Sequence, residues 1–224
     1  LCRDWSSDVC SSDLEAVARL GRHQFPLVLT DTVAQFLAAV SEETGLTFDT
    51  DSGDLRGVIE KLGPMARMLN AVLHDTANPT MLKAGYKANV VPAIAEAVVD
   101  CRILPGRKQA FEAEIDELIG PDVTREWIKD FESYETSFDG DLVDAMNDAV
   151  LALDPDARTV PYMLSGGTDA KSFARLGIRC FGFSPLRLPP DLDFTALFHG
   201  VDERVPIDAL RFGTDVLTHF LTHC

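Results

Sequence analysis

Apolar residues recur at helical spacing along much of the chain. Val33, Phe36, Leu37 and Val40 fall at i, i+3, i+4 and i+7, and Thr30 stands where a side chain can cap a helix N-terminus. The same period predicts further helices over residues 55–62, 64–72, 111–119, 142–153 and 207–221. The chain is therefore expected to be rich in amphipathic helices, each with one face turned toward a core.

Strands are predicted between some of these helices. The segments TMLKAGYKANVVP (residues 80–92) and AEAVVDCRILPG (95–106) indicate two strands joined by a turn, with Val99, Cys101 and Ile103 on one apolar face of the second. Further strands are predicted over residues 122–132, 158–164 and 178–186.

The order of the elements predicts a mixed α/β chain in two parts. Strand, strand, helix and strand over residues 80–132 make a small α+β module with an antiparallel sheet and helices on one face. Beyond a boundary near Ser137, helices alternate with strands, which is typical of an α/β layer.

Composition narrows the classes of partner. A net charge of −16 argues against nucleic acid, which requires clustered Lys and Arg. No apolar run approaches the roughly 20 residues of a membrane-spanning helix. The 5 cysteines are odd in number and contain no Cys-x-x-Cys pair, which favours a reducing cytoplasm over a disulfide framework or a thiolate zinc site.

The first 14 residues, LCRDWSSDVCSSDL, do not follow the pattern of the rest. They lack an initiator Met, repeat Ser-Ser-Asp, and show neither helical nor strand periodicity. They resemble a translated sequencing adapter, so residues 1–14 are set aside as non-native, and the natural protein is expected to extend further upstream.

Two features offer candidate binding groups for an anion. Gly166, Gly167 and Thr168 lie between a predicted strand and a predicted helix, where free amides attract carboxylates. A plain structural turn would use the same residues.

Arg102 stands on the polar face of its strand and Asn89 precedes a strand end, so these two residues are candidates for binding a carboxylate. The alternative is a solvated sheet face on which Arg102 pairs with a neighbouring acid.

His199, in the segment LFHGVDERVP, is a candidate metal ligand. Asp202 and Glu203 follow closely and are able to orient its ring. A zinc site needs three or four ligands, and the other histidines show no ligand spacing in the sequence. From these residues alone, an ordinary loop histidine explains the pattern better.

Three motifs in order nevertheless resemble one family. KANVVPAIAEAVVDCRILPG, SGGTDAKSFARLGI and LFHGVDERVPIDALRFG are similar to the C-terminal part of the dinuclear-zinc amidohydrolases and peptidases that include carboxypeptidase G, succinyl-diaminopimelate desuccinylase and aminoacylase. The resemblance covers residues 15–224 and implies a lid or dimerisation domain over residues 15–136, without its first strand. Residues 137–224 are then the last segment of a zinc-binding α/β sandwich.

The resemblance also implies roles for single residues. His199 corresponds to a zinc ligand, Asn89 and Arg102 to groups that hold the substrate carboxylate, and the loop formed by Gly166, Gly167 and Thr168 to a wall of the substrate pocket. Glu203 is expected to support His199 or to be structural.

The resemblance predicts a parent protein that hydrolyses amide bonds in peptides or N-acyl amino acids, using two zinc ions or other divalent metals. The early motifs that carry the remaining ligands and the general base are not visible, so this chain alone is expected to be an inactive fragment. A homodimer through the lid domain is expected. The alternative is a non-catalytic module for dimerisation or for binding a carboxylate or peptide.

Overall fold

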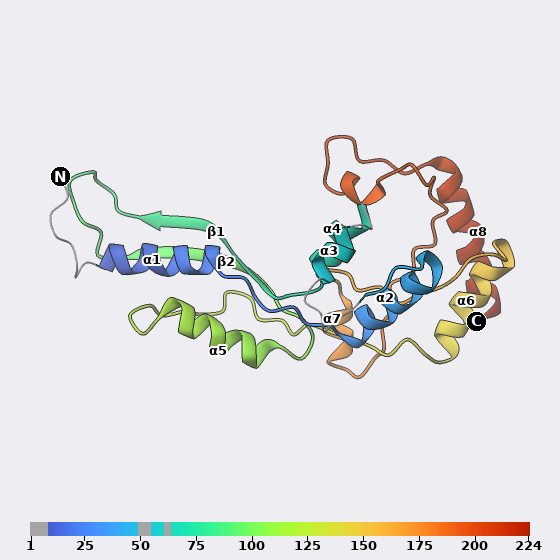
Figure 1. The fold of residues 1–224 in the computed structure, drawn as a ribbon, viewed down its shortest axis with the longest axis horizontal. Coiled ribbons are helices and arrows are strands. Elements are labelled where there is room, and N and C mark those ends of the chain that lie inside the picture. The colour runs from blue at the N-terminus through green and yellow to red at the C-terminus, as the bar shows by residue number, and fades with distance from the viewer. Residues whose placement is uncertain (1–8, 49–54, 61–63) are drawn as a thin grey trace. The chain divides into compact units, whose positions relative to one another are not determined.

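The structure, a computed structural model, describes residues 9–48, 55–60 and 64–224. The chain divides into two compact units (Figure 1): unit 1 comprises Leu1–Val28 and Leu73–Ser133, and unit 2 comprises Leu29–Val72 and Tyr134–Cys224. One break between the units falls after Ser133, and the domain boundary expected near Ser137 stays a prediction. Residues 29–72, which the sequence placed in the first domain, instead cluster with the C-terminal part.

Unit 1 is built on one antiparallel hairpin. Its elements are α1 (Val9–Arg22), β1 (Thr76–Ala84), β2 (Ala95–Arg102) and α5 (Lys108–Ile119). Helix α1 packs on both strands and against α5 (Figure 1). The predicted pairing of two strands is confirmed, although β1 begins earlier than expected and residues 85–94 form a connection.

A proline displaces the ladder of the hairpin by one residue. Pro79 pairs with Val99, but Met81 pairs with Val98, so the register shifts between the two. Proline has no backbone N–H to donate, and strand prolines are therefore found at bulges and edges.

The core of unit 1 lies between its helices and one face of the sheet. Phe25 and Phe111 stack with ring centroids 5.2 Å apart. Val99, Cys101 and Ile103 pack against this core, which confirms the face predicted from alternation. Buried residues of α1 and α5 complete the core: Ala16, Leu20, Ile115 and Ile119.

Helix α1 includes part of the segment that was set aside as non-native, and the origin of that segment stays a prediction. The sequence showed no helical period over residues 1–14, yet α1 begins at Val9 and buries Ala16 and Leu20. The helix was missed because its buried face starts after the segment that was set aside. Residues 1–8 lie outside the described part of the chain.

A buried carboxylate joins the start of β1 to the chain beyond β2. Asp75 is fully buried, and its Oδ1 accepts a hydrogen bond from the Leu104 amide at 2.7 Å. Its Oδ2 accepts from Arg107 Nε at 3.1 Å. A buried charge is tolerated when it is paired and hydrogen-bonded, and Asp75 has both kinds of partner.

Unit 2 is helical where the structure describes it. Its elements are α2 (Asp31–Thr44), α3 (Leu55–Glu60), α4 (Pro64–Asn70), α6 (Asp141–Leu153), α7 (Ala170–Ala174), the 3-10 helix η1 (Phe194–Leu197) and α8 (Ile207–His223). Thr30 Oγ1 accepts from the Val33 amide, as predicted for the cap of α2. Helix α6 packs against α8, and α4 contacts α3 and η1.

Three predicted strands are wrong. Within the described residues, segments 122–132, 158–164 and 178–186 form no strand, and β1–β2 is the one sheet. Their composition suits strands, but a strand also needs a partner with which to exchange hydrogen bonds. The molecule is thus a mixture of helices and a two-stranded antiparallel sheet, without the predicted α/β layer in the described part.

Arg179 fixes the turn that leads into α6. Its Nη2 donates to the Ser137 carbonyl at 2.7 Å and to Asp139 Oδ1 at 2.8 Å. The guanidinium also lies 5.3 Å from the centre of the Phe181 ring. One planar side chain therefore holds the entry to α6 against segment 178–186.

Helix α8 buries a different face from the predicted one. Ala209, Gly213 and Val216 are buried, with Gly213 close to the chain near Pro185. The helical period of the sequence predicts a buried face made of Ile207, Leu210, Leu217, Phe220 and Leu221, but all of these except the partly buried Phe220 are exposed. None of the described helices is long and apolar enough to cross a membrane.

Replacing Gly213 with Ala is expected to destabilise unit 2. A Cβ at this position would lie 2.5 Å from the Pro185 carbonyl oxygen, so backbone must move. We expect a loss of roughly 1–3 kcal/mol in urea unfolding, typical of overpacking. Gly21→Ala in α1 is the matched control, since its Cβ would meet nothing within 4 Å and Ala favours helix. Equal unfolding midpoints for the two variants would contradict the close approach.

Replacing Asp75 with Ala is expected to unfold unit 1 selectively. The change leaves the Leu104 amide and the Arg107 guanidinium without their carboxylate, and removing one member of a buried pair costs roughly 3–5 kcal/mol. Hydrogen exchange on the amides of β1 and β2 measures the effect. Asp100→Ala removes the same charge from an exposed pair and should change exchange little. Similar exchange in both variants would refute the role of Asp75.

Candidate functional site

Arg102 and Asn89 lie at opposite ends of the hairpin in unit 1. Arg102 pairs with Thr76 at one end of the ladder, while Ala84 pairs with Ala95 at the other. Asn89 belongs to the connection of residues 85–94, which extends beyond that second end (Figure 1). Seven residues of β2 span about 23 Å, so within one copy the structure does not bring Asn89 and Arg102 together.

Arg102 forms an ion pair on the exposed face of the sheet. Its Nε donates to Asp100 Oδ2 at 2.9 Å, and the two side chains are about half exposed, at 52% and 48%. This is the sheet-face pairing that the sequence offered as the alternative to substrate binding. An exposed pair of this kind contributes little stability, so the guanidinium can exchange Asp100 for another carboxylate at small cost.

The loop of Gly166, Gly167 and Thr168 is exposed and precedes a short helix in unit 2. Thr168 Oγ1 accepts from the Ala170 amide at 3.3 Å. Helix α7 covers only 5 residues, Ala170–Ala174, so its dipole adds little to anion binding. The glycines are accessible to a ligand, and the loop itself shows the features of a structural turn.

His199 has the most unusual backbone among the candidate residues. It is exposed and adopts φ 57°, the one positive φ at a non-glycine position in the described part of the chain. The left-handed region costs an L-residue about 1–2 kcal/mol, and such strain is concentrated at functional sites. The sequence gave no signal for this strain.

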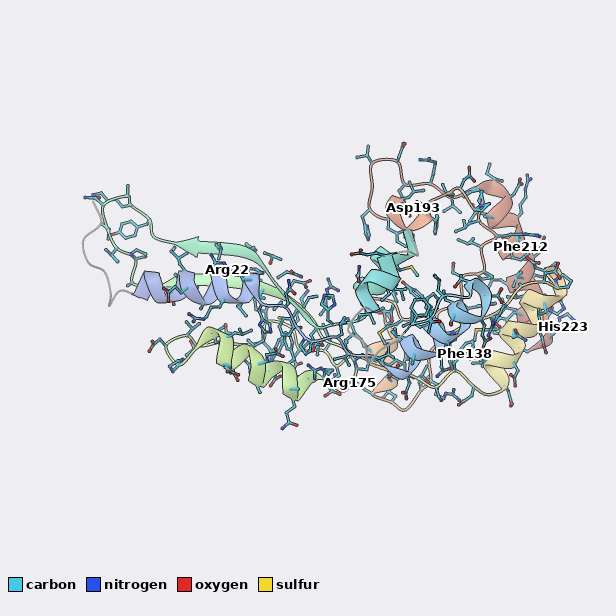
Figure 2. All side chains as sticks on the ribbon, viewed as in Figure 1. Arg22, Phe138, Arg175, Asp193, Phe212 and His223 are labelled. Carbon is cyan, nitrogen blue, oxygen red and sulfur yellow. The ribbon has the colours of Figure 1, made fainter. Side chains whose placement is uncertain are left out.

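Hydrogen bonds stabilise the turn around His199 on both sides of this residue in the sequence. Before it, Asp193 caps η1 by accepting from the Ala196 amide at 3.1 Å (Figure 2). After it, the Gly200 amide donates to the Leu197 carbonyl at 3.0 Å. The strained residue is therefore fixed by its neighbours and projects into solvent.

Two acidic residues, Asp202 and Glu203, closely follow His199 in the sequence. Asp202 pairs with Arg204, with 3.3 Å between the Arg204 Nη1 and the Asp202 Oδ2. Glu203 is exposed, and no hydrogen bond joins it to His199 among the described residues. The expected support of His199 by Glu203 stays a prediction.

The described residues do not bring three metal ligands together. No group of three or more His, Cys, Asp or Glu side chains is placed to hold an ion in the described part of the chain. Zinc sites take three or four ligands, so His199 is at most a single donor here. Arg102 and Asn89 belong to unit 1, whereas His199 and the glycine loop belong to unit 2.

Cys101 is not a nucleophile. Burial, with a smaller contribution from the Asp100 carboxylate, raises the pKa of the Cys101 thiol to about 11. The thiol is therefore protonated near neutral pH, whereas a catalytic cysteine needs a lowered pKa. Its side chain packs against the core of unit 1.

One pair of histidines was misjudged from the sequence. His219 and His223 were thought to lack ligand spacing, yet they are four residues apart and their rings stack in α8. The i, i+4 spacing in the sequence already indicates that the two imidazoles share one face of the helix.

Replacing His199 by Gly and by Ala separates backbone strain from side-chain chemistry. Both variants lose the imidazole, but only Gly relieves the cost of the positive φ. We expect His199→Gly to be more stable than His199→Ala by about 1 kcal/mol in urea unfolding. A more stable Ala variant would show that the left-handed backbone at residue 199 is not present in solution.

Comparison with known proteins identifies the family. The model of peptidase family M20/M25/M40 matches residues 14–223. The human N-fatty-acyl-amino acid synthase/hydrolase PM20D1 is 26% identical over 204 residues, which are 87% of this chain and 40% of the relative. Pig aminoacylase-1 is 30% identical over 158 residues, 66% of this chain and 36% of the relative. The probable carboxypeptidase S-like 2 of Dictyostelium discoideum is 26% identical over 159 residues, 68% of this chain and 30% of the relative.

The chain spans two fifths or less of the length of these relatives. No solved structure gives a significant match. The family model nevertheless covers almost the whole chain, including every candidate residue named above. The chain therefore belongs to peptidase family M20/M25/M40.

Proposed function

We propose that this chain is part of a hydrolase that cleaves amide bonds in N-acyl amino acids or peptides. The observation that carries the proposal is the match of residues 14–223 to peptidase family M20/M25/M40. Two relatives support the substrate class. One is named an N-fatty-acyl-amino acid synthase/hydrolase, and the other is named an aminoacylase.

In this proposal Arg102 binds the free carboxylate of the substrate. Its guanidinium is half exposed and already holds a carboxylate, that of Asp100. When the substrate carboxylate replaces Asp100, the positive charge of Arg102 stays paired. The planar guanidinium can bind a carboxylate through two parallel hydrogen bonds, a bidentate arrangement. Gly166, Gly167 and Thr168 are proposed to line the pocket, where the absence of side chains on the glycines admits the substrate.

The hairpin geometry supports a homodimer in this role. Asn89 and Arg102 are separated by most of the length of β2, so one copy cannot place both on the same carboxylate. If both bind it, they come from two copies of the chain. We therefore propose that unit 1 is the lid and dimerisation domain, and that the rest contributes to a zinc-binding α/β sandwich.

The expected zinc ions are not accommodated by the described residues alone. His199 is proposed as one ligand, and further donors would have to come from another part of a longer protein. Zinc or another divalent ion would act there as a Lewis acid. The contribution of this chain is to bind and orient the substrate, and we assign no proton transfer to it.

A non-catalytic binding module is the second candidate. The lack of three converging metal donors in the described part of the chain favours it for this chain taken alone. Such a module would keep the carboxylate-binding role of Arg102 and the dimerisation role of unit 1, but it would not turn over substrate. The cytoplasm is the proposed location on either view.

Replacing Arg102 tests the proposal in an intact protein that contains this chain. Arg102→Ala is expected to raise the KM for an N-acyl amino acid by roughly 10- to 100-fold, the value of a charged hydrogen bond. The KM for the matching N-acyl alkylamine, which has no carboxylate, should not change. Lys83→Ala is the control, since Lys83 is an exposed cation on the same hairpin.

Two outcomes would count against the proposal. Equal effects of Arg102→Ala on both substrates would assign Arg102 a structural role. No hydrolysis of either substrate by the intact protein would favour the binding module.

A further inference from the structure

The C-terminal end of α8 brings two imidazoles together. His219 and His223 are separated by one helical turn, and their ring centroids lie 4.1 Å apart with 16° between the ring planes. Figure 2 shows His223 at this end of the helix. Histidines at i and i+4 share one helix face, the spacing with which helices present two ligands to one ion.

We infer that His219 and His223 form a chelating site for one transition-metal ion of the Ni²⁺, Cu²⁺ or Zn²⁺ class. Neutral imidazole is a good ligand for these ions. Two nitrogens and solvent molecules would make up the coordination shell, since no third His, Cys, Asp or Glu donor joins them in the described part of the chain. The inference is independent of the proposed amide hydrolysis.

The hydrogen bonds of His223 leave the correct nitrogen free. Its Nδ1 lies 2.8 Å from the His219 carbonyl oxygen and 2.9 Å from Thr222 Oγ1. A carbonyl oxygen only accepts, so Nδ1 carries the hydrogen and donates it. The neutral ring then has its lone pair on Nε2, the atom that binds metal, and the carbonyl fixes the ring as in many metal sites.

Thr222 strengthens this arrangement. Its hydroxyl lies 2.8 Å from the Thr218 carbonyl oxygen and 3.0 Å from the His219 carbonyl oxygen. When the hydroxyl donates to either carbonyl, its oxygen is free to accept from His223 Nδ1. The Nδ1 of His219 is buried and has no hydrogen-bond partner, so the nitrogen of His219 proposed to bind the ion is Nε2.

The pair is distinct from the candidate site at His199. His219 lies 12 residues after Ile207, the first residue of α8, which corresponds to about 18 Å along the helix axis. His199 precedes that first turn. Asp215, one turn before His219, is exposed and adds a negative charge on the same face, which favours a cation.

Titration of the complete 224-residue chain with Ni²⁺ by isothermal calorimetry tests the inference. We expect one site, and we expect His219→Gln and His223→Gln each to weaken it by roughly 100-fold, because the second ligand then no longer binds intramolecularly. Cys224→Ser is the control and should leave the affinity unchanged. Circular dichroism checks that each variant keeps its helix content.

Three results would overturn the inference. The wild-type chain failing to bind Ni²⁺ at millimolar concentration would exclude the chelate. Unchanged binding by a folded His219→Gln or His223→Gln variant would place the ion elsewhere. Loss of binding in Cys224→Ser would show that the thiol, rather than the histidine pair, holds the ion.

Discussion

The buried carboxylate of Asp75 is the constraint on which unit 1 depends. Asp75 is the one charged residue that is buried among the side chains whose burial the structure describes. It requires partners, because an unpaired buried charge costs much free energy. Its partners, Leu104 and Arg107, lie on the chain that leaves β2 and enters α5. These hydrogen bonds therefore fix the chain between the end of β2 and the start of α5, the helix that carries the buried Phe111. Arg102 pairs with Thr76, the residue after Asp75, so the candidate substrate-binding arginine is positioned by it as well.

The candidate residues are divided between the two units. Unit 1 presents Arg102 on a rigid sheet, and unit 2 presents His199 on a strained turn between η1 and α8. The candidate carboxylate-binding arginine thus belongs to one unit, and the candidate metal ligand belongs to the other.

Sequence patterns predicted the local features of the fold and missed those that depend on distant partners. The cap of α2 by Thr30 and the helix over residues 111–119 were foreseen, because both depend on residues a few positions apart. The strands over 158–164 and 178–186 were not formed, because pairing requires a neighbour that periodicity does not specify. The α8 face was also wrong, since Gly213 permits an approach to Pro185 that bulky residues would block. His199 was found through the order of motifs, whereas its positive φ and the distance between Asn89 and Arg102 required the structure.

We propose His199 as a metal ligand in this member of peptidase family M20/M25/M40. Anomalous diffraction at the zinc edge, from crystals of an intact protein containing this chain, would test this role. We predict a zinc peak about 2.0–2.1 Å from an imidazole nitrogen of His199, the usual zinc–histidine distance. Zinc peaks bound entirely by other residues, with His199 free in solvent, would contradict it.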